Sequence, residues 1–377
     1  MVSYERRGFK TILNKFKYID GWFWCRYSVN PYSGCEFACT YCDSRSHKYH
    51  LHSEFDQIVY AKTDVGFMLD GRLRRARTLL PDVVAIGGSG DAYQPAEERF
   101  HNTHKCLEVL LRHHYPVFIS TKSDLVRRDA DLLGSIARDS WCTVATTITT
   151  FDQGVTGLME PLAPPPEKRL KAIEEIKYKR PGIQAGVNLI PVIPFLTDGE
   201  DDLAEVVSRT KGAGADFVLF GSGMTMRDDQ ARWFLTRLKE IRPELLPGYL
   251  DLYGATFDPV GGYQGNFGPS SSYLKRIDNL LIRLCEENQL PYRVKRFIPN
   301  DFRRTNYLVS EVLLNQAYRS RIEGRPWKNI HWAGMNIGIL KESLENVAEK
   351  GELGKIRNVT PELERRVLNL MELFERS

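Results

Sequence analysis

The chain has 377 residues, of which 42% are hydrophobic, so it can bury a sizeable core in one long domain or two without disulfide support. Its formal net charge is only +4, and its seven cysteines are an odd number, which argues against a secreted disulfide framework. The longest apolar runs are too short to span a membrane and the N-terminus lacks a signal-peptide pattern, so we expect a cytoplasmic protein without membrane association.

Short apolar segments alternate with longer helical patterns over the first 225 residues. We expect β-strands at 26–29, 83–86, 117–120, 143–148, 184–193 and 216–220. We expect helices between them at 102–113, 129–138, 166–179 and 200–213. This order is typical of parallel βαβ units in an α/β fold.

Three cysteines stand just after the first expected strand, at Cys35, Cys39 and Cys42. Their C-x3-C-x2-C spacing lets three thiolates reach three irons of a 4Fe-4S cluster, which leaves the fourth iron open to another ligand. Tyr41 would add apolar cover over such a cluster and could pack on a purine. The alternative interpretation is a structural zinc ion held by the three cysteines and His47.

With Gly34 and Tyr41 beside the cysteines, this loop resembles that of the radical S-adenosylmethionine (SAM) enzymes. The resemblance implies that Cys35, Cys39 and Cys42 hold a 4Fe-4S cluster whose open iron binds the amino and carboxylate groups of the cofactor's methionine. It implies that an electron from the reduced cluster cleaves SAM to methionine and a 5'-deoxyadenosyl radical, which abstracts hydrogen from a substrate. An external one-electron donor such as flavodoxin or ferredoxin is also implied.

A glycine turn follows the second expected strand, at Gly87, Gly88 and Ser89. Glycine has no side chain to block a ligand, so such a turn can expose its backbone to one. In the resembling family, this turn contacts the methionine amino group of SAM. The turn lacks the Gly-Lys-Ser/Thr of a phosphate-binding P-loop.

Polar residues stand at or near the ends of three later strands. Lys122 could hold the SAM carboxylate as a point charge, or it could be a solvated strand-end lysine. Thr147 aligns with a ribose or methionine contact in the family, although threonine is also ordinary in strands. Asn188 interrupts an apolar strand as either an active-site amide or a hydrogen-bonded core amide. Since barrel sites lie at strand ends, we expect these residues to gather with Cys35 and Gly87.

Segments 91–97, 120–123 and 159–161 narrow the resemblance to the spore photoproduct lyase-like branch, over about residues 30–194. In the lyase, a cysteine on the loop after the second strand returns a hydrogen atom to the product radical. The matching loop here, 87–91, has no cysteine, so the resemblance covers the branch and not the repair reaction. The substrate is left open among a nucleic-acid base, a peptide side chain and a small metabolite.

The other four cysteines show no C-x2-C pairing that would predict a second cluster. We expect them to be small buried hydrophobic residues: Cys25, Cys106, Cys142 and Cys285.

A basic segment lies near the C-terminus, at 292–328. It contains nine Lys or Arg residues but only three acidic residues, with aromatic residues between them. Such a segment can bind nucleic acid through phosphate contacts and base stacking. The alternative is a solvated helix face. Two helices are expected between 335 and 377, the second with Thr360 as its N-cap and Pro361 at its first position.

The expected fold class is α/β, a partial (β/α)6 TIM-like barrel with a smaller, mainly helical, basic C-terminal region. The expected parts are an N-terminal extension (1–29), the radical SAM partial barrel (30–225), a barrel-closing segment whose glycine-rich stretch is a lid or linker (226–299), and the helical basic region (300–377). The expected function is a radical SAM enzyme. The alternative is a zinc-stabilised nucleic-acid-binding protein without turnover. The sequence predicts no oligomeric state.

Overall fold

The structure, a computed structural model, describes residues 2–76 and 78–376. The chain forms two compact units. The barrel unit comprises Met1–Asn14, Ser28–Leu80 and Val84–Val294, and the helical unit comprises Lys15–Tyr27, Pro81–Val83 and Lys295–Ser377. The expected N-terminal extension, 1–29, is therefore divided between the two units, and the second unit's C-terminal part begins at Lys295.

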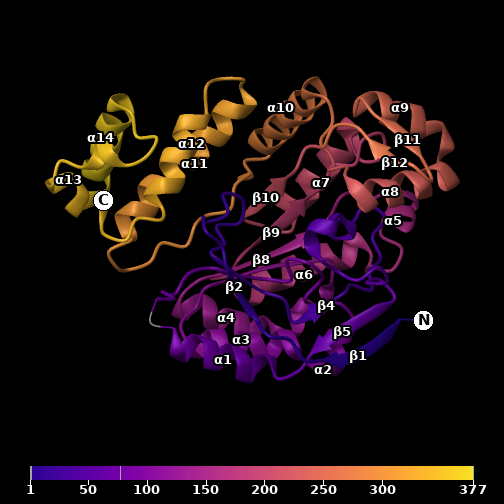
Figure 1. Cartoon of the computed structure of the whole chain (residues 1–377), viewed down its shortest axis with the longest axis horizontal. Coiled ribbons are helices and arrows are strands. Elements are labelled where there is room, and N and C mark those ends of the chain that lie inside the picture. Colours follow the sequence, from indigo (N-terminus) through magenta and orange to yellow (C-terminus); the bar gives the residue numbers. More distant parts are fainter. Residues whose placement is uncertain (1, 77, 377) are drawn as a thin grey trace. The chain divides into compact units, whose positions relative to one another are not determined.

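A seven-stranded sheet with the order β10-β9-β8-β7-β6-β3-β2 is the framework of the barrel (Figure 1). Its strands are β2 (Leu13–Lys15), β3 (Tyr27–Val29), β6 (Val84–Ile86), β7 (Val117–Thr121), β8 (Cys142–Thr147), β9 (Gln184–Leu189) and β10 (Phe217–Phe220). The strands from β6 to β10 pair in parallel. The six expected strands correspond to β3 and β6–β10, so the partial (β/α)6 barrel is confirmed.

Strand β9 is shorter than expected, because it ends at Leu189 and not near 193. Pro191 follows two residues later, and proline has no N–H to donate to a neighbouring strand. The chain therefore leaves the sheet at this point.

Helices connect the strands and cover the sheet, and the four expected ones are confirmed as α3, α4, α6 and α7 (Figure 1). The helices of the barrel unit are α1 (Val65–Arg75), α2 (Ala96–Phe100), α3 (Asn102–Arg112), α4 (Ala130–Asp139), α5 (Gln153–Met159), α6 (Pro166–Lys179), α7 (Glu200–Gly212), α8 (Asp228–Ile241), α9 (Leu246–Leu252) and α10 (Ser271–Glu287). Apolar residues of β9 and β10, such as Val187 and Val218, pack with Leu203 and Val206 of α7. This packing buries one face of the sheet and leaves the other to the barrel interior.

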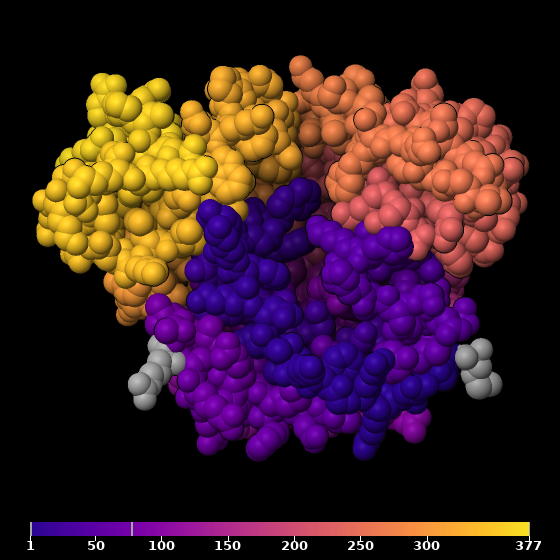
Figure 2. Space-filling view, viewed as in Figure 1, coloured from indigo at the N-terminus to yellow at the C-terminus, as the bar shows by residue number. Residues whose placement is uncertain are grey.

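A second, three-stranded sheet lies at the start of the barrel unit, with the order β1-β5-β4. Its strands are β1 (Ser3–Arg7), β4 (Tyr32–Ser33) and β5 (Ile58–Lys62). In the space-filling view, indigo and violet atoms of these N-terminal segments lie at the visible surface (Figure 2). Since β4 pairs with β5, this sheet holds the start of the cysteine loop.

The glycine-rich stretch 261–272 is not one open loop. Its first part completes a two-stranded antiparallel hairpin of β11 (Thr256–Asp258) and β12 (Gly262–Gln264). Its last residues begin α10, where the Ser270 side chain accepts a hydrogen bond from the Tyr273 N–H.

The helical unit is built around α11 (Arg304–Ile322), α12 (Lys328–Ile337), α13 (Leu344–Glu349) and α14 (Pro361–Glu375). Residues such as Leu313, Ile337 and Val367 form its apolar core. Helix α14 starts where expected, with the Thr360 hydroxyl accepting from the Leu363 N–H. Within residues 2–76 and 78–376, no helix combines the length and hydropathy that a membrane crossing needs.

Candidate functional site

The three cysteines of the C-x3-C-x2-C motif lie on the loop that follows β4, all as free thiols. Cys39 is buried, and Cys35 and Cys42 are half-buried against the same apolar cluster, which includes Phe37 and Tyr41. Burial raises the pKa of Cys39 to about 12. Burial also raises the pKa of Cys35, with smaller contributions from Asp91 and the other two thiols. Thiols in such an environment need a cation to become thiolate ligands.

Gly34 allows the cysteine loop to pass very close to the backbone of Phe55 and Ile58 as it leaves β4. Its φ is +107°, and an added Cβ would lie 2.6 Å from the Ile58 oxygen and 2.8 Å from the Phe55 oxygen. The Cys35 N–H donates to the same Phe55 oxygen at 2.8 Å. Only glycine fits both the backbone angle and the space, so this residue sets the position of Cys35.

The glycine turn after β6 lies directly against the cysteine loop. A Cβ added to Gly90 would lie 2.8 Å from the Gly34 oxygen and 3.6 Å from the Cys35 Cβ. The Ser89 N–H donates to the Asn30 side chain at 3.3 Å, and Gly87 has a φ of +89°. The turn therefore brings its bare backbone beside the first cysteine.

Gln94 forms hydrogen bonds to both the cysteine loop and the loop after β6. Its Nε2 donates to the Gly34 oxygen at 3.0 Å and to the Asp91 oxygen at 3.1 Å, and its Oε1 accepts from the Glu36 N–H at 3.1 Å. Gln94 is fully buried, so these bonds are strong constraints on both loops. The segment 91–97 was part of the resemblance, but the role of Gln94 becomes visible only in the structure.

Lys122 lies at the end of β7, close to the cysteine loop. Its backbone N–H donates to the Asp91 Oδ2 at 2.6 Å, and its Nζ lies 5.4 Å from the centroid of the Tyr41 ring. Burial lowers the pKa of Lys122, but the nearby Cys39 and Glu160 outweigh this and raise it. The positive charge of Lys122 therefore lies at the same edge of the sheet as the three thiols.

Glu160, which was not expected as a site residue, connects Tyr41 to the barrel. The Tyr41 hydroxyl donates to Glu160, and the Arg169 Nη1 lies 2.5 Å from the Glu160 Oε2. Burial raises the pKa of Glu160, but Arg169 and Lys122 outweigh this and lower it. Arg169 Nη1 also donates to the Thr147 oxygen at 3.0 Å, so the buried pair ties the cysteine loop to the end of β8. The segment 159–161 was the only sequence signal for this role.

Thr147 and Asn188 are opposite each other in the pairing of β8 with β9, and both are buried. The Asn188 Nδ2 donates to the Ser120 Oγ of β7 at 3.0 Å. Its Oδ1 is buried and has no hydrogen-bond partner among the described residues. An orphaned acceptor of this kind needs an explanation, and a polar ligand at the strand ends would supply one.

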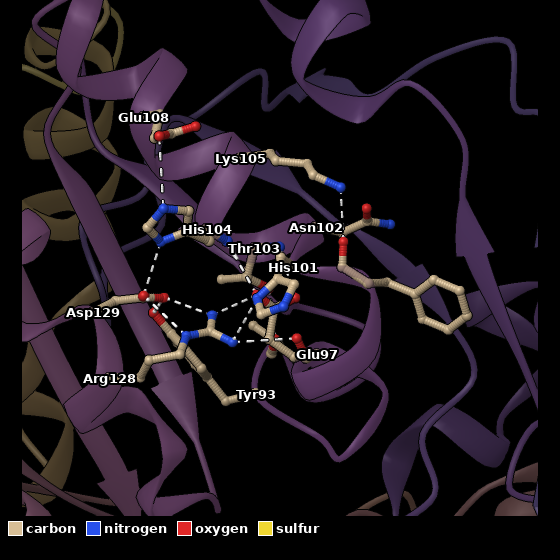
Figure 3. Close-up of polar contacts among 12 residues, drawn as sticks. Tyr93, Glu97, His101, Asn102, Thr103, His104, Lys105, Glu108, Arg128 and Asp129 are labelled. Atoms are coloured by element: carbon tan, nitrogen blue, oxygen red, sulfur yellow. Dashed lines mark hydrogen bonds and ion pairs between the residues drawn. The ribbon is translucent and has the colours of Figure 1, made fainter.

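A partly buried polar network holds the segment 91–97 in place (Figure 3). Arg128 Nη2 lies 2.6 Å from Glu97 Oε1 and 2.9 Å from Asp129 Oδ2. Asp129 also accepts from the Tyr93 hydroxyl at 3.0 Å and lies 2.9 Å from His104 Nδ1. The network joins residues before and within α2, within α3 and before α4, so it holds the loop that carries Gln94.

The zinc tetrahedron with His47 is not formed. His47 Nε2 lies 2.6 Å from Asp229 Oδ2, and the His47 side chain is 72% exposed. Among residues 2–76 and 78–376, no group of three or more His, Cys, Asp or Glu side chains is arranged to hold one metal ion. A cubane cluster does not need this, because its cysteines bind separate irons. The donor set and its apolar surroundings fit the cluster better than zinc.

The four remaining cysteines are all buried, as expected: Cys25, Cys106, Cys142 and Cys285. Burial raises the pKa of Cys106 and of Cys285 to about 12, which disfavours reactive thiolates at these positions.

The basic segment 292–328 does not form one continuous exposed face. Four of its arginines are buried or ion-paired: Arg296, Arg303, Arg319 and Arg325. Arg303, for example, lies 2.6 Å from Asp301, and Arg319 lies 3.1 Å from Glu323. A count of charges along the sequence therefore overstated the cationic surface.

Comparisons with known proteins agree with this site. The family model described as the Radical SAM superfamily matches residues 29–207. An uncharacterised protein of Mycobacterium tuberculosis is 34% identical over 232 residues, which cover 60% of this chain and 67% of that protein. An uncharacterised protein of Methanocaldococcus jannaschii is 30% identical over 181 residues, 48% of this chain and 65% of that protein.

The structure of a spore photoproduct lyase complexed with dinucleoside spore photoproduct has the same fold, with a TM-score of 0.56. The alignment covers 75% of this chain and 79% of the lyase at 14% sequence identity. This chain therefore belongs to the radical SAM superfamily and has the fold of its spore photoproduct lyase-like branch.

Proposed function

We propose that this protein is an enzyme that binds a 4Fe-4S cluster through Cys35, Cys39 and Cys42 and binds SAM beside it. The observation that carries the proposal is the close approach of the glycine turn to the cysteine loop, where a Gly90 Cβ would lie 2.8 Å from the Gly34 oxygen. When bound, such a cluster would supply the electron for cleavage of SAM to methionine and a 5'-deoxyadenosyl radical, and this radical would abstract hydrogen from the substrate.

The residues around the thiols bind different parts of SAM or cover the cluster. Gly87, Gly88 and Ser89 present backbone groups to the methionine amino group, and glycine at the first two positions keeps that approach open. Lys122 holds the methionine carboxylate through its charge. Tyr41, fixed by its hydrogen bond to Glu160, covers the cluster and helps to exclude water.

Thr147 and Asn188 complete the cofactor site at the ends of β8 and β9. Their side chains share one face of the sheet. The Asn188 Oδ1, which has no partner in the described part of the chain, is available to a hydroxyl or amino donor of the cofactor. This placement agrees with the general position of sites in parallel barrels.

We propose that the electron comes from an external donor such as flavodoxin or ferredoxin. The four cysteines outside the motif are separate buried thiols and offer no ligand set for a second, internal cluster. The substrate that loses hydrogen is an organic molecule, and nucleic acid is the class to test first because of the cations described below.

The test is anaerobic reconstitution followed by dithionite and SAM, with iron content and 5'-deoxyadenosine measured. We expect about four irons per chain and deoxyadenosine release in the parent protein. Cys35→Ala, Cys39→Ala and Cys42→Ala should each abolish release, while circular dichroism stays unchanged because a barrel of this size has its own core. Cys285→Ala, a buried thiol on α10, is the matched control and should retain release.

Two results would overturn the proposal. One is undiminished deoxyadenosine release in any single variant of the motif. The other is a colourless protein with one zinc that unfolds on chelation, which would restore the structural-zinc alternative.

A further inference from the structure

A cavity of about 1050 Å³ lies within the helical unit, between the end of α11 and the starts of α12 and α14. Its lining comes from two stretches far apart in the sequence, 324–330 and 360–369, together with Gln316 of α11. Its volume is at the upper end of the range for small-molecule sites. None of these residues belongs to the site described above.

The lining is strongly cationic. It contains four cationic side chains and only one carboxylate, that of Glu362. The cations are those of Arg325, Lys328, Arg365 and Arg366. Arg325 is ion-paired with a glutamate outside the cavity, but the other three cations have no ion pair among the described residues. Cations that outnumber the carboxylates around them attract anions, since a concave surface of mainly one sign concentrates the field.

Two helices begin at this cavity. Helix α12 has ten residues and starts at Lys328, and no side chain caps it. Helix α14 has fifteen residues and starts at Pro361, capped by Thr360. At α12 the uncapped first-turn N–H groups and the positive end of the helix dipole favour an anion such as phosphate. The start of α14 favours an anion less, because Pro361 has no N–H, the Leu363 N–H is already bonded to Thr360, and Glu362 and Glu364 lie in its first turn.

Two buried atoms at the cavity lack partners in the described part of the chain. They are the Nε of Arg366, a donor, and the Oε1 of Gln316, an acceptor. A ligand that offers both an acceptor and a donor would satisfy them, whereas a bare anion would satisfy only the first. Trp327, half-buried in the same lining, offers a flat ring on which a planar group can stack.

We propose that this cavity binds a nucleotide, either free or as part of a single strand. Its phosphate contacts Lys328, Arg365 and Arg366 together with the start of α12. Trp327 stacks on its base, and Gln316 accepts a hydrogen bond from a base amino group. The proposed surface includes α14 and leaves out the buried arginines of the segment 292–328, so it differs from the face that charge counting predicted.

The first experiment measures binding of a fluorescein-labelled single-stranded oligonucleotide to the full-length protein by anisotropy, at two salt concentrations. Lys328→Gln and Arg365→Gln change exposed residues, so folding should be retained and circular dichroism will check it. Each should weaken binding about tenfold and lower the logarithmic salt slope by about 0.7. Lys341→Gln removes an exposed charge outside the cavity of the same unit, and should change neither quantity.

The second experiment tests the base. Trp327→Ala should weaken binding roughly 5- to 150-fold if it stacks on one base, whereas Trp332→Ala, on the same helix but outside the lining, should not. Adenosine monophosphate and inorganic phosphate are the competitors. Full competition by the mononucleotide supports a free nucleotide as ligand, and binding of the oligonucleotide alone supports a strand. Equal competition by inorganic phosphate, no binding at low salt, or binding unaffected at Lys328 and Arg365 overturns the proposal.

Discussion

Gly34→Ala should separate the cysteine loop from the segment that supports it. The added Cβ would lie 2.6 Å and 2.8 Å from two backbone oxygens, of Ile58 and Phe55, and neither can rotate away as a side chain could. A backbone φ of +107° costs a non-glycine residue at least about 1–2 kcal/mol. Overpacking against rigid neighbours adds about 1–3 kcal/mol. We therefore expect the barrel unit to lose about 2–5 kcal/mol of stability.

This loss can be measured as a melting temperature and as iron content. For a unit of this size, the melting temperature should fall by about 4–10 °C, and the iron retained after anaerobic reconstitution should fall with it. Gly90→Ala strains the same contact from the other side, since its Cβ would lie 2.8 Å from the Gly34 oxygen. Gly71→Ala in α1 is the control, because nothing lies within 4 Å of its added Cβ. If Gly34→Ala melts and binds iron like Gly71→Ala, the argument from close approach is wrong.

Three further changes test other parts of the site. Glu160→Ala leaves Arg169 buried without its carboxylate, so the free energy of unfolding should fall by about 3–5 kcal/mol in urea denaturation. Lys122→Ala should weaken SAM binding by about ten- to a hundredfold in equilibrium dialysis, with the cluster absorbance retained. Burial raises the pKa of Asp129, but hydrogen bonds from Arg128 and a histidine outweigh this and lower it. Asp129 therefore stabilises the fold above its unfolded pKa, and this stability is lost as the pH falls through the lower folded value. Asp129→Asn should lower the melting temperature at neutral pH and weaken its further fall below about pH 4.

Matched variants separate these effects from charge removal alone. Glu174→Ala, Lys171→Ala and Asp201→Asn change exposed residues of α6 and α7. Urea curves of Glu160→Ala that coincide with those of Glu174→Ala would mean that the buried pair contributes nothing. Unchanged SAM affinity in Lys122→Ala would mean that this lysine does not bind the cofactor and has only a structural role. If the melting temperature of Asp129→Asn depends on pH in the same way as that of Asp201→Asn, the network around Asp129 does not contribute to the loss of stability in acid.

Local sequence patterns were sufficient for the element order of this chain. Short apolar runs marked β6, which ends in a glycine turn, and β7, and the spacing of apolar residues marked α3 and α6, because backbone conformation responds mainly to near neighbours. Thr360 and Pro361 marked the start of α14 to the residue. The cysteine spacing, with Gly34 and Tyr41 beside it, favoured an iron–sulfur cluster over zinc, since three ligands on one short loop need no distant partner.

Tertiary structure decided which distant residues share a site. Gln94, Glu160 and Arg169 act on the cysteine loop from other parts of the barrel. The family resemblance included segments 91–97 and 159–161, but it did not indicate which residues these side chains contact. The sequence suggested that Arg303 is a free cation, but the fold buries it and its Nη2 donates to the distant Pro81 oxygen at 3.0 Å. The cavity of the helical unit joins 324–330 to 360–369, which no local pattern connects. Side-chain burial and pairing depend on contacts between residues far apart in the chain, so they follow from packing and cannot be counted along the sequence.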